Sequence, residues 1–121
     1  IALDFALNRL AGMIEGMVVY EDQIKNNLEA LGGLYFSQNV LLELTQAGMS
    51  REDAYKQVQT NAMDVWHEIC DGQPASFEEK IKTDKTVTDL VPADKLDACF
   101  DITQYTRHAR DTWARVKKVY A

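Results

Sequence analysis

Apolar residues recur at helical spacing along most of this chain. The first set steps by four and three residues along one face: Leu3, Leu7, Leu10, Ile14 and Met17. This spacing predicts an amphipathic α-helix from the first residues to about Val18. Phe5 and Val18 widen the apolar face, as in a helix that several neighbours cover.

Similar patterns, separated by glycine, proline and capping residues, predict the other helices. Gly32-Gly33, Gly48 and Asp71-Gly72-Gln73-Pro74 mark the principal stops. The expected helices cover residues 21–30, 34–47, 50–69, 76–83, 92–99 and 103–120, with one more short turn at 86–90.

Helix starts carry recognisable caps. Ser50 followed by Asp53 is a shortened capping box, and Ser76 followed by Glu79 is a complete one. Pro92 suits the first helical position. Glu21 and Lys25 are spaced as an i,i+4 ion pair, which contributes only a few tenths of a kcal/mol.

The pattern also predicts which side chains are buried. The helix at 34–47 should bury Phe36, Val40, Leu41 and Leu44. The helix at 50–69 should bury Tyr55, Val58, Ala62, Val65 and Ile69, with Trp66 broadening the apolar face. The last should bury Tyr105, Ala109, Trp113, Val116 and Tyr120. No convincing strand emerges, since the β-tolerant patch around Val87 and Val91 is too short. We expect an all-α fold, a compact helical bundle of about five to seven helices.

Composition narrows the class of protein. Apolar residues make up 46% and charged residues 26% of the 121 residues, which is ordinary for one globular domain. Thirteen Lys and Arg against nineteen Asp and Glu give a net charge of −6, which disfavours nucleic acid and anionic membranes as partners. No apolar run approaches the roughly 18 residues of a membrane span. Cys70 and Cys99 are too few for a disulfide framework, and we expect two buried thiols in a cytoplasmic protein.

Candidate chemistry is sparse. His67 and Cys70 have the i,i+3 spacing of two metal ligands, with His108 and Cys99 as the remaining candidates, but the spacings match no common zinc pattern. Two of the serines, Ser50 and Ser76, are explained by capping, and no strand-turn-helix elbow surrounds any serine. The carboxylates Glu78, Glu79 and Asp53 are typical of a solvated face. We assign no catalytic, cofactor-binding or metal-binding residue and expect no cofactor.

Two polar segments leave alternatives open. Ser37, Gln38 and Asn39 are consecutive polar residues in an otherwise apolar helix, and they either satisfy backbone groups or face a cleft. The basic residues near the end are Arg107, His108, Arg110, Arg115, Lys117 and Lys118. They complement the negative end of the helix dipole and aid solubility, although they could also contact a phosphate or an acidic partner.

Several of these segments together resemble one enzyme family. They are Leu34 to Leu42, Gly48 to Tyr55, Val58-Gln59 and Ala62 to Trp66. This order is similar to the C-terminal domain of the adenylosuccinate lyase family, within the fumarase/aspartase superfamily. Ala6 to Leu10 and Met17 to Tyr20 resemble the end of that family's central-bundle helix, and Cys99-Phe100-Asp101 resembles its tail. One departure is Asn39, where the family usually has a basic residue.

The resemblance implies a function for a longer parent protein. Residues 1–20 would be the end of a central-bundle helix and residues 21–121 the helical C-terminal domain. The parent would cleave adenylosuccinate to AMP and fumarate by β-elimination in purine biosynthesis, as a cytoplasmic homotetramer. Its partners would be its own upstream catalytic domain and identical subunits. The family's catalytic and phosphate-binding residues lie upstream of Ile1, and His67 and His108 match none of them. We therefore expect this piece alone to be inactive.

Two other interpretations remain. The chain could belong to a sister lyase of the superfamily that acts on another succinyl or carboxylate substrate. It could instead be a helical interaction module without chemistry. Because no capping residue precedes the first apolar stripe at Ile1, we favour the downstream part of a longer protein.

Overall fold

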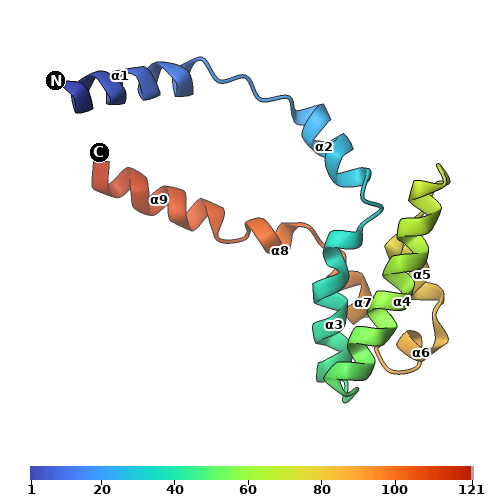
Figure 1. Ribbon diagram of the computed structural model, residues 1–121. Coiled ribbons are helices and arrows are strands. Elements are labelled where there is room, and N and C mark those ends of the chain that lie inside the picture. Colours follow the sequence, from blue (N-terminus) through green and yellow to red (C-terminus); the bar gives the residue numbers. More distant parts are fainter. Residues whose placement is uncertain (121) are drawn as a thin grey trace. The chain divides into compact units, whose positions relative to one another are not determined.

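A computed structural model describes residues 1–120, and within that range the regular elements are all helices, without strands, which confirms the all-α prediction. Figure 1 shows the order of the helices. The elements are α1 (Ala2–Glu15), α2 (Glu21–Glu29), the 3-10 turn η1 (Leu34–Phe36), α3 (Ser37–Gln46), α4 (Arg51–Cys70), α5 (Phe77–Thr83), α6 (Lys85–Thr88), α7 (Ala93–Cys99), α8 (Thr103–Thr106) and α9 (Ala109–Tyr120). The chain divides into two units, residues 1–30 and 31–121.

The first unit consists of α1 and α2, and none of its side chains is buried. The first helix stops at Glu15, so the prediction that it reaches Val18 is wrong. Gly16 forms its C-cap, with its N–H donating to Gly12 O at 3.1 Å. Glycine and the β-branched valines that follow have low helix propensity, which explains the early end. In α2, Lys25 pairs with Glu29 at 3.7 Å rather than with Glu21.

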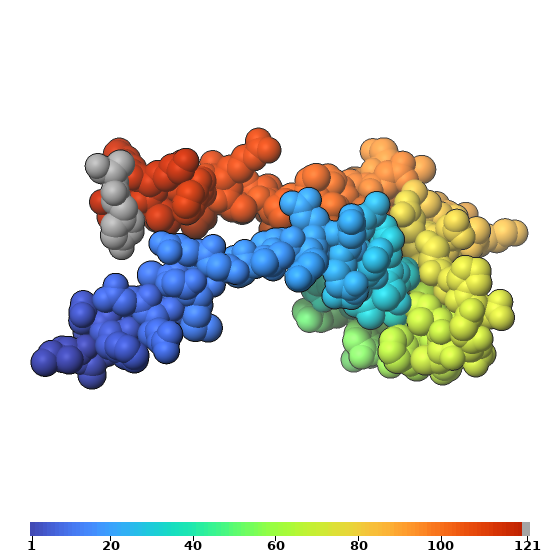
Figure 2. Space-filling view, turned by 90° about the horizontal axis from the view of Figure 1, so that it is seen from above, coloured from blue at the N-terminus to red at the C-terminus, as the bar shows by residue number. Residues whose placement is uncertain are grey.

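The second unit contains the hydrophobic core. It forms where α3 packs on α4 and where α5, α6 and α7 cover that pair, and Figure 2 shows α4 lying against α5. The buried apolar residues are Phe36, Val40, Leu44, Ala54, Val58, Val65, Phe77, Ile81, Val87, Val91, Leu96 and Cys99. This core fixes the relative positions of α3 to α7.

Burial in α3 follows the predicted face, and burial in α4 follows it except at two aromatic residues. Val58 and Val65 are buried as expected, whereas Tyr55 is 56% exposed and Trp66 is 44% exposed. Ala54 and Asn61 take the core positions instead. Ala62 and Ile69 pack against the core and are partly buried, so most of the predicted stripe is correct, and the prediction is wrong for the large aromatic side chains of Tyr55 and Trp66.

The predicted caps are confirmed. Ser50 Oγ accepts from Asp53 N at 3.1 Å at the start of α4, and Ser76 Oγ accepts from Glu79 N at 3.3 Å at the start of α5. Pro92, predicted as a first helical residue, is instead the N-cap of α7, with an extended ψ of 149°. Its ring still fixes φ at −59°, so the helix begins one residue later.

The predicted last helix is divided. Arg107 and His108 separate α8 from α9, and Tyr105 and Trp113 are 55% and 60% exposed. Ala109 and Val116 are exposed too, so the predicted burial of this helix is wrong for these residues, while the side chain of Tyr120 lies outside the described ones. Within residues 1–120, none of the helices has the length and apolarity needed to cross a bilayer.

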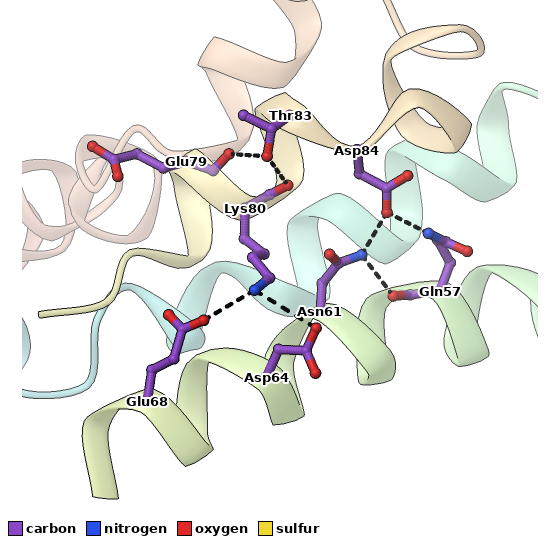
Figure 3. A network of polar contacts seen from close by, with 8 residues as sticks. All are labelled: Gln57, Asn61, Asp64, Glu68, Glu79, Lys80, Thr83 and Asp84. Carbon is purple, nitrogen blue, oxygen red and sulfur yellow. Dashed lines mark hydrogen bonds and ion pairs between the residues drawn. The ribbon is translucent and has the colours of Figure 1, made fainter. Parts of the chain in front are cut away.

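A polar network joins α4 to the start of α6 (Figure 3). Buried Asn61 donates from Nδ2 to Asp84 Oδ2 at 2.7 Å and to Gln57 O at 3.0 Å, and Gln57 Nε2 donates to the same carboxylate oxygen. The N–H of Thr86 donates to Asp84 Oδ1 at 2.9 Å, which caps α6. Burial alone would raise the pKa of Asp84, but the hydrogen bonds from Asn61, Gln57 and the backbone outweigh it and lower that pKa.

A second polar link in Figure 3 holds α5 to α4. Lys80 Nζ lies 3.1 Å from Glu68 Oε1 and 3.6 Å from Asp64 Oδ2. The hydrogen bond to Glu68, aided by the charge of Asp64, raises the pKa of Lys80. These side chains are partly exposed, so the link orients α5 more than it stabilises the fold.

A close backbone approach fixes where residues 31–36 meet α5. Gly32 has φ +54°, and its carbonyl accepts from Phe77 N at 2.8 Å. A Cβ at this position would lie 2.7 Å from Ala75 O and 3.0 Å from Ile69 Cδ1. Only glycine therefore fits at residue 32, both for its backbone conformation and for the space available.

The variant Gly32→Ala tests this contact against the matched control Gly72→Ala. Gly72 also has positive φ, at +73°, but nothing lies within 4 Å of the added Cβ. We expect the control to lose about 1 kcal/mol of unfolding free energy from backbone strain. Gly32→Ala should lose roughly 2 kcal/mol more from the clash. Urea unfolding followed by circular dichroism measures both, and equal losses would contradict the close approach.

The variant Asp84→Asn tests the network through pH. Because the pKa of Asp84 is lowered in the folded state, its carboxylate stabilises the fold above the unfolded pKa of about 3.9. That stabilisation is lost as pH falls through the folded pKa. We expect the variant to lose about 1 kcal/mol near neutral pH, with the loss shrinking at acid pH. Exposed Asp89→Asn is the control, and a loss that does not depend on pH would contradict the assignment.

Candidate functional site

An open groove lies between α3 and α4. Ser37, Gln38 and Leu41 line it from α3, and Tyr55, Val58, Gln59 and Ala62 line it from α4. The groove follows from which residues of α4 face the core. Because Ala54, Val58 and Val65 face the core, Tyr55, Gln59 and Ala62 fall along the adjacent side of the helix.

The chemistry of the groove is neutral. Its polar groups are the hydroxyls of Ser37 and Tyr55 and the amides of Gln38 and Gln59, and its apolar part comes from Leu41, Val58 and Ala62. None of these seven side chains carries a charge at neutral pH. Such a surface can bind a partner through hydrogen bonds and apolar contact. Its lining contains no His, Asp, Glu, Lys or Cys side chain.

The two alternatives for the polar segment Ser37, Gln38 and Asn39 were to face a cleft or to satisfy a backbone group, and each holds for part of the segment. Ser37 and Gln38 line the groove, whereas Asn39 satisfies a backbone group. Its Nδ2 donates to the carbonyl of Cys99 at 2.9 Å, the last residue of α7. Asn39 therefore ties α3 to the C-terminal end of α7, where helix carbonyls lack partners within the helix.

The four His and Cys candidates lie in different surroundings. His67 and Cys70 are exposed near the end of α4, Cys99 is buried in the core, and His108 is exposed between α8 and α9. Within residues 1–120, no cluster of three or more His, Cys, Asp and Glu is arranged to hold a metal ion. The expectation of two buried thiols is correct for Cys99 and wrong for Cys70.

The other sequence candidates have structural roles. Ser50 and Ser76 are helix caps, and Asp53 accepts a hydrogen bond from Ser50 Oγ at 2.7 Å. Glu78 pairs with Lys82 at 2.6 Å on the surface of α5. Sequence reasoning missed the network of Asn61 and Asp84. The available signal was a polar residue at helical spacing between Val58 and Val65.

The basic residues of the C-terminal part are all exposed. Arg107 Nε donates to His108 Nε2 at 3.1 Å, and His108 lies 3.9 Å from Asp111. Lys117 Nζ lies 5.3 Å from the ring centroid of Trp113, within cation–π range.

Comparison with known proteins identifies the family of this chain. Residues 33–116 match the family model described as the adenylosuccinate lyase C-terminus. The chain belongs to the adenylosuccinate lyase family. It is also 36% identical over 112 residues to an adenylosuccinate lyase of Synechocystis sp., an alignment that covers 93% of this chain and 25% of the relative. The chain thus spans about a quarter of the length of the curated relative it matches.

The matched range includes the core, the groove and most of α9. Membership of the adenylosuccinate lyase family thus confirms the resemblance drawn from the segments between Leu34 and Trp66. It also gives a context for Asn39, because the side chain at that position joins two helices of the C-terminal domain.

Thiol labelling tests the surroundings of the two cysteines. Burial, and secondarily the charge of Glu43, raise the pKa of the Cys99 thiol from 9.0 to about 11. That shift alone lowers its thiolate fraction roughly 100-fold near neutral pH. We expect one fast reaction with Ellman's reagent, abolished in Cys70→Ser, and one slow reaction limited by unfolding. Two fast reactions in the folded chain would contradict the burial of Cys99.

Proposed function

We propose that this chain is the C-terminal part of an adenylosuccinate lyase. The whole protein would cleave adenylosuccinate to AMP and fumarate by β-elimination, in purine biosynthesis in the cytoplasm. One observation carries the proposal, the family match over residues 33–116, and the lyase named among the relatives supports the substrate. The sister-lyase interpretation has no comparable support.

The role of this part is structural. A β-elimination needs a base for the proton beside the carboxylate and an acid for the leaving nitrogen. No His, Asp, Glu, Lys or Cys lines the groove between α3 and α4, and the serines at residues 50 and 76 are occupied as caps. We therefore assign catalysis to the remainder of the lyase and give this domain the task of packing against it.

The apolar face of α1 supports this role. Leu3, Leu7, Leu10 and Ile14 are between 51% and 74% exposed. A continuous apolar stripe of this kind is rarely left in water, because its burial is favourable by roughly 25 cal/mol per Å². We propose that residues 1–20 are the end of a central-bundle helix. The upstream catalytic domain and identical subunits of a homotetramer would cover it.

The test is an activity and mass measurement on the product of the complete reading frame. Since 112 residues are 25% of the relative, we expect a protein of about 450 residues that releases fumarate from adenylosuccinate. The 121-residue chain alone should release none. Fumarate released only from another succinyl substrate would favour the sister lyase. A protein that ends at these 121 residues and is inactive would favour the interaction module.

A further inference from the structure

Helix α9 carries an apolar strip with cations along one edge. Ala109, Trp113 and Val116 recur at helical spacing and form this α9 strip, in which Trp113 is 60% exposed. Arg110 precedes the tryptophan by three residues and Lys117 follows it by four, so both cations lie beside the indole on the same edge. Lys117 Nζ is 5.3 Å from the centroid of the indole ring.

The other charges of α9 lie away from the α9 strip. The edge across from the two flanking cations carries Thr112 and Val119, which are uncharged. Arg115 and Lys118 project from the opposite face, together with Asp111, because each residue turns the helix by about 100°. The surface that fits this helix is therefore apolar, with carboxylates along one side only.

The segment before α9 is tied to the core, but α9 itself is not covered. Tyr105 of α8 donates its hydroxyl to the carbonyl of Tyr35 at 3.3 Å, and Gln104 Nε2 donates to the carbonyl of Ala98 in α7 at 2.6 Å. Every side chain described in residues 103–119 is nevertheless exposed. Exposed apolar surface next to cations on a folded helix marks a contact site rather than a solvated face.

The chain outside these residues is the best candidate for the cover. The family match continues to residue 116, so most of α9 belongs to the C-terminal domain of the family. The chain spans only about a quarter of its relative's length. A segment of the same polypeptide meets α9 at an effective concentration on the order of millimolar, which favours it over a separate molecule. The net charge of −6 disfavours nucleic acid and anionic lipid.

We propose that the α9 strip docks on the remainder of its own lyase chain, at an apolar surface that has Asp or Glu along one side. Trp113 covers the apolar part, Arg110 and Lys117 pair with the carboxylates, and Arg115 and Lys118 stay in water. The inference rests on the proposed function, since it takes this chain as part of a longer lyase. It adds to the role of α1 a second docking surface, which differs in being flanked by cations.

The first test compares two neighbouring lysines within the complete lyase. N-hydroxysuccinimide acetate labels exposed lysine, hydroxyl radicals label exposed tryptophan, and mass spectrometry locates both products. Relative to the lyase unfolded in urea, we expect labelling of Trp113 and Lys117 to fall severalfold, because docking covers both. Lys118, the next residue but on the opposite face, is the matched control and should stay reactive. Equal labelling of the two lysines in the folded lyase would overturn the proposal.

Charge reversal on either face of α9 tests the one-sided recognition. The double variant Arg110→Glu, Lys117→Glu should raise the radical labelling of Trp113 severalfold, because it places like charges against the carboxylates. The control Arg115→Glu, Lys118→Glu makes the same change of charge on the opposite face and should leave Trp113 protected. All four residues are exposed, so both variants should keep the fold of the domain. The same labelling of Trp113 in both variants would contradict docking through one edge.

Cross-linking identifies the docked segment. A carbodiimide couples lysine to carboxylate without a spacer, and we expect it to join Lys117 to an Asp or Glu upstream of Ile1. In lyase assembled from a mixture of isotope-labelled and unlabelled chains, the joined peptides should come from the same chain. Cross-links that pair different chains, or the lack of any cross-link from Lys117 to an upstream carboxylate, would overturn the proposal.

Fumarate release from the same samples separates this inference from the proposed function. Release of fumarate with Trp113 fully labelled would overturn docking and leave the lyase assignment intact. Protected Trp113 without release from adenylosuccinate would support docking and contradict the proposed substrate.

Discussion

The packing of α3 against α4 is the interaction on which the rest of this structure depends. Val40 and Leu44 meet Val58 and Val65 across the pair, and all four are buried. Each such side chain contributes about 1.5–3 kcal/mol when it leaves water. The pair then provides the surface on which Phe77 and Ile81 of α5 bury themselves and to which Asn39 ties α7. The neutral groove lies between the same two helices.

The helices α1 and α9 lie outside this core and differ from the core helices in the exposure of their apolar residues. The apolar residues of α1 and α9 have helical spacing but are exposed, as for helices whose partners belong to other segments or other copies. Membership of the adenylosuccinate lyase family, with a match to about a quarter of a relative's length, accounts for that pattern if the remainder of the lyase covers α1.

Local signals in the sequence predicted local structure well. The caps at Ser50 and Ser76 depend on residues three positions apart, and both were found. Burial depends on what lies opposite a face, so Tyr55 and Trp113 were wrongly placed inside. The link of Asn61 to Asp84 joins residues 23 positions apart, and the groove needs two helices at once. The periodicity of one segment carries no information about the link between Asn61 and Asp84 or about the groove. The family resemblance succeeded because it compares several segments together.

The most direct test of the central claim compares hydrogen exchange in α1 between the 121-residue chain and the product of the complete reading frame. In the isolated chain nothing buries Leu3, Leu7 or Leu10, so the amides of α1 should exchange rapidly. In the complete protein they should exchange slower by several orders of magnitude if, as proposed, the remainder of the lyase covers them. Equally rapid exchange in both would contradict the claim that this chain is one part of a larger lyase body.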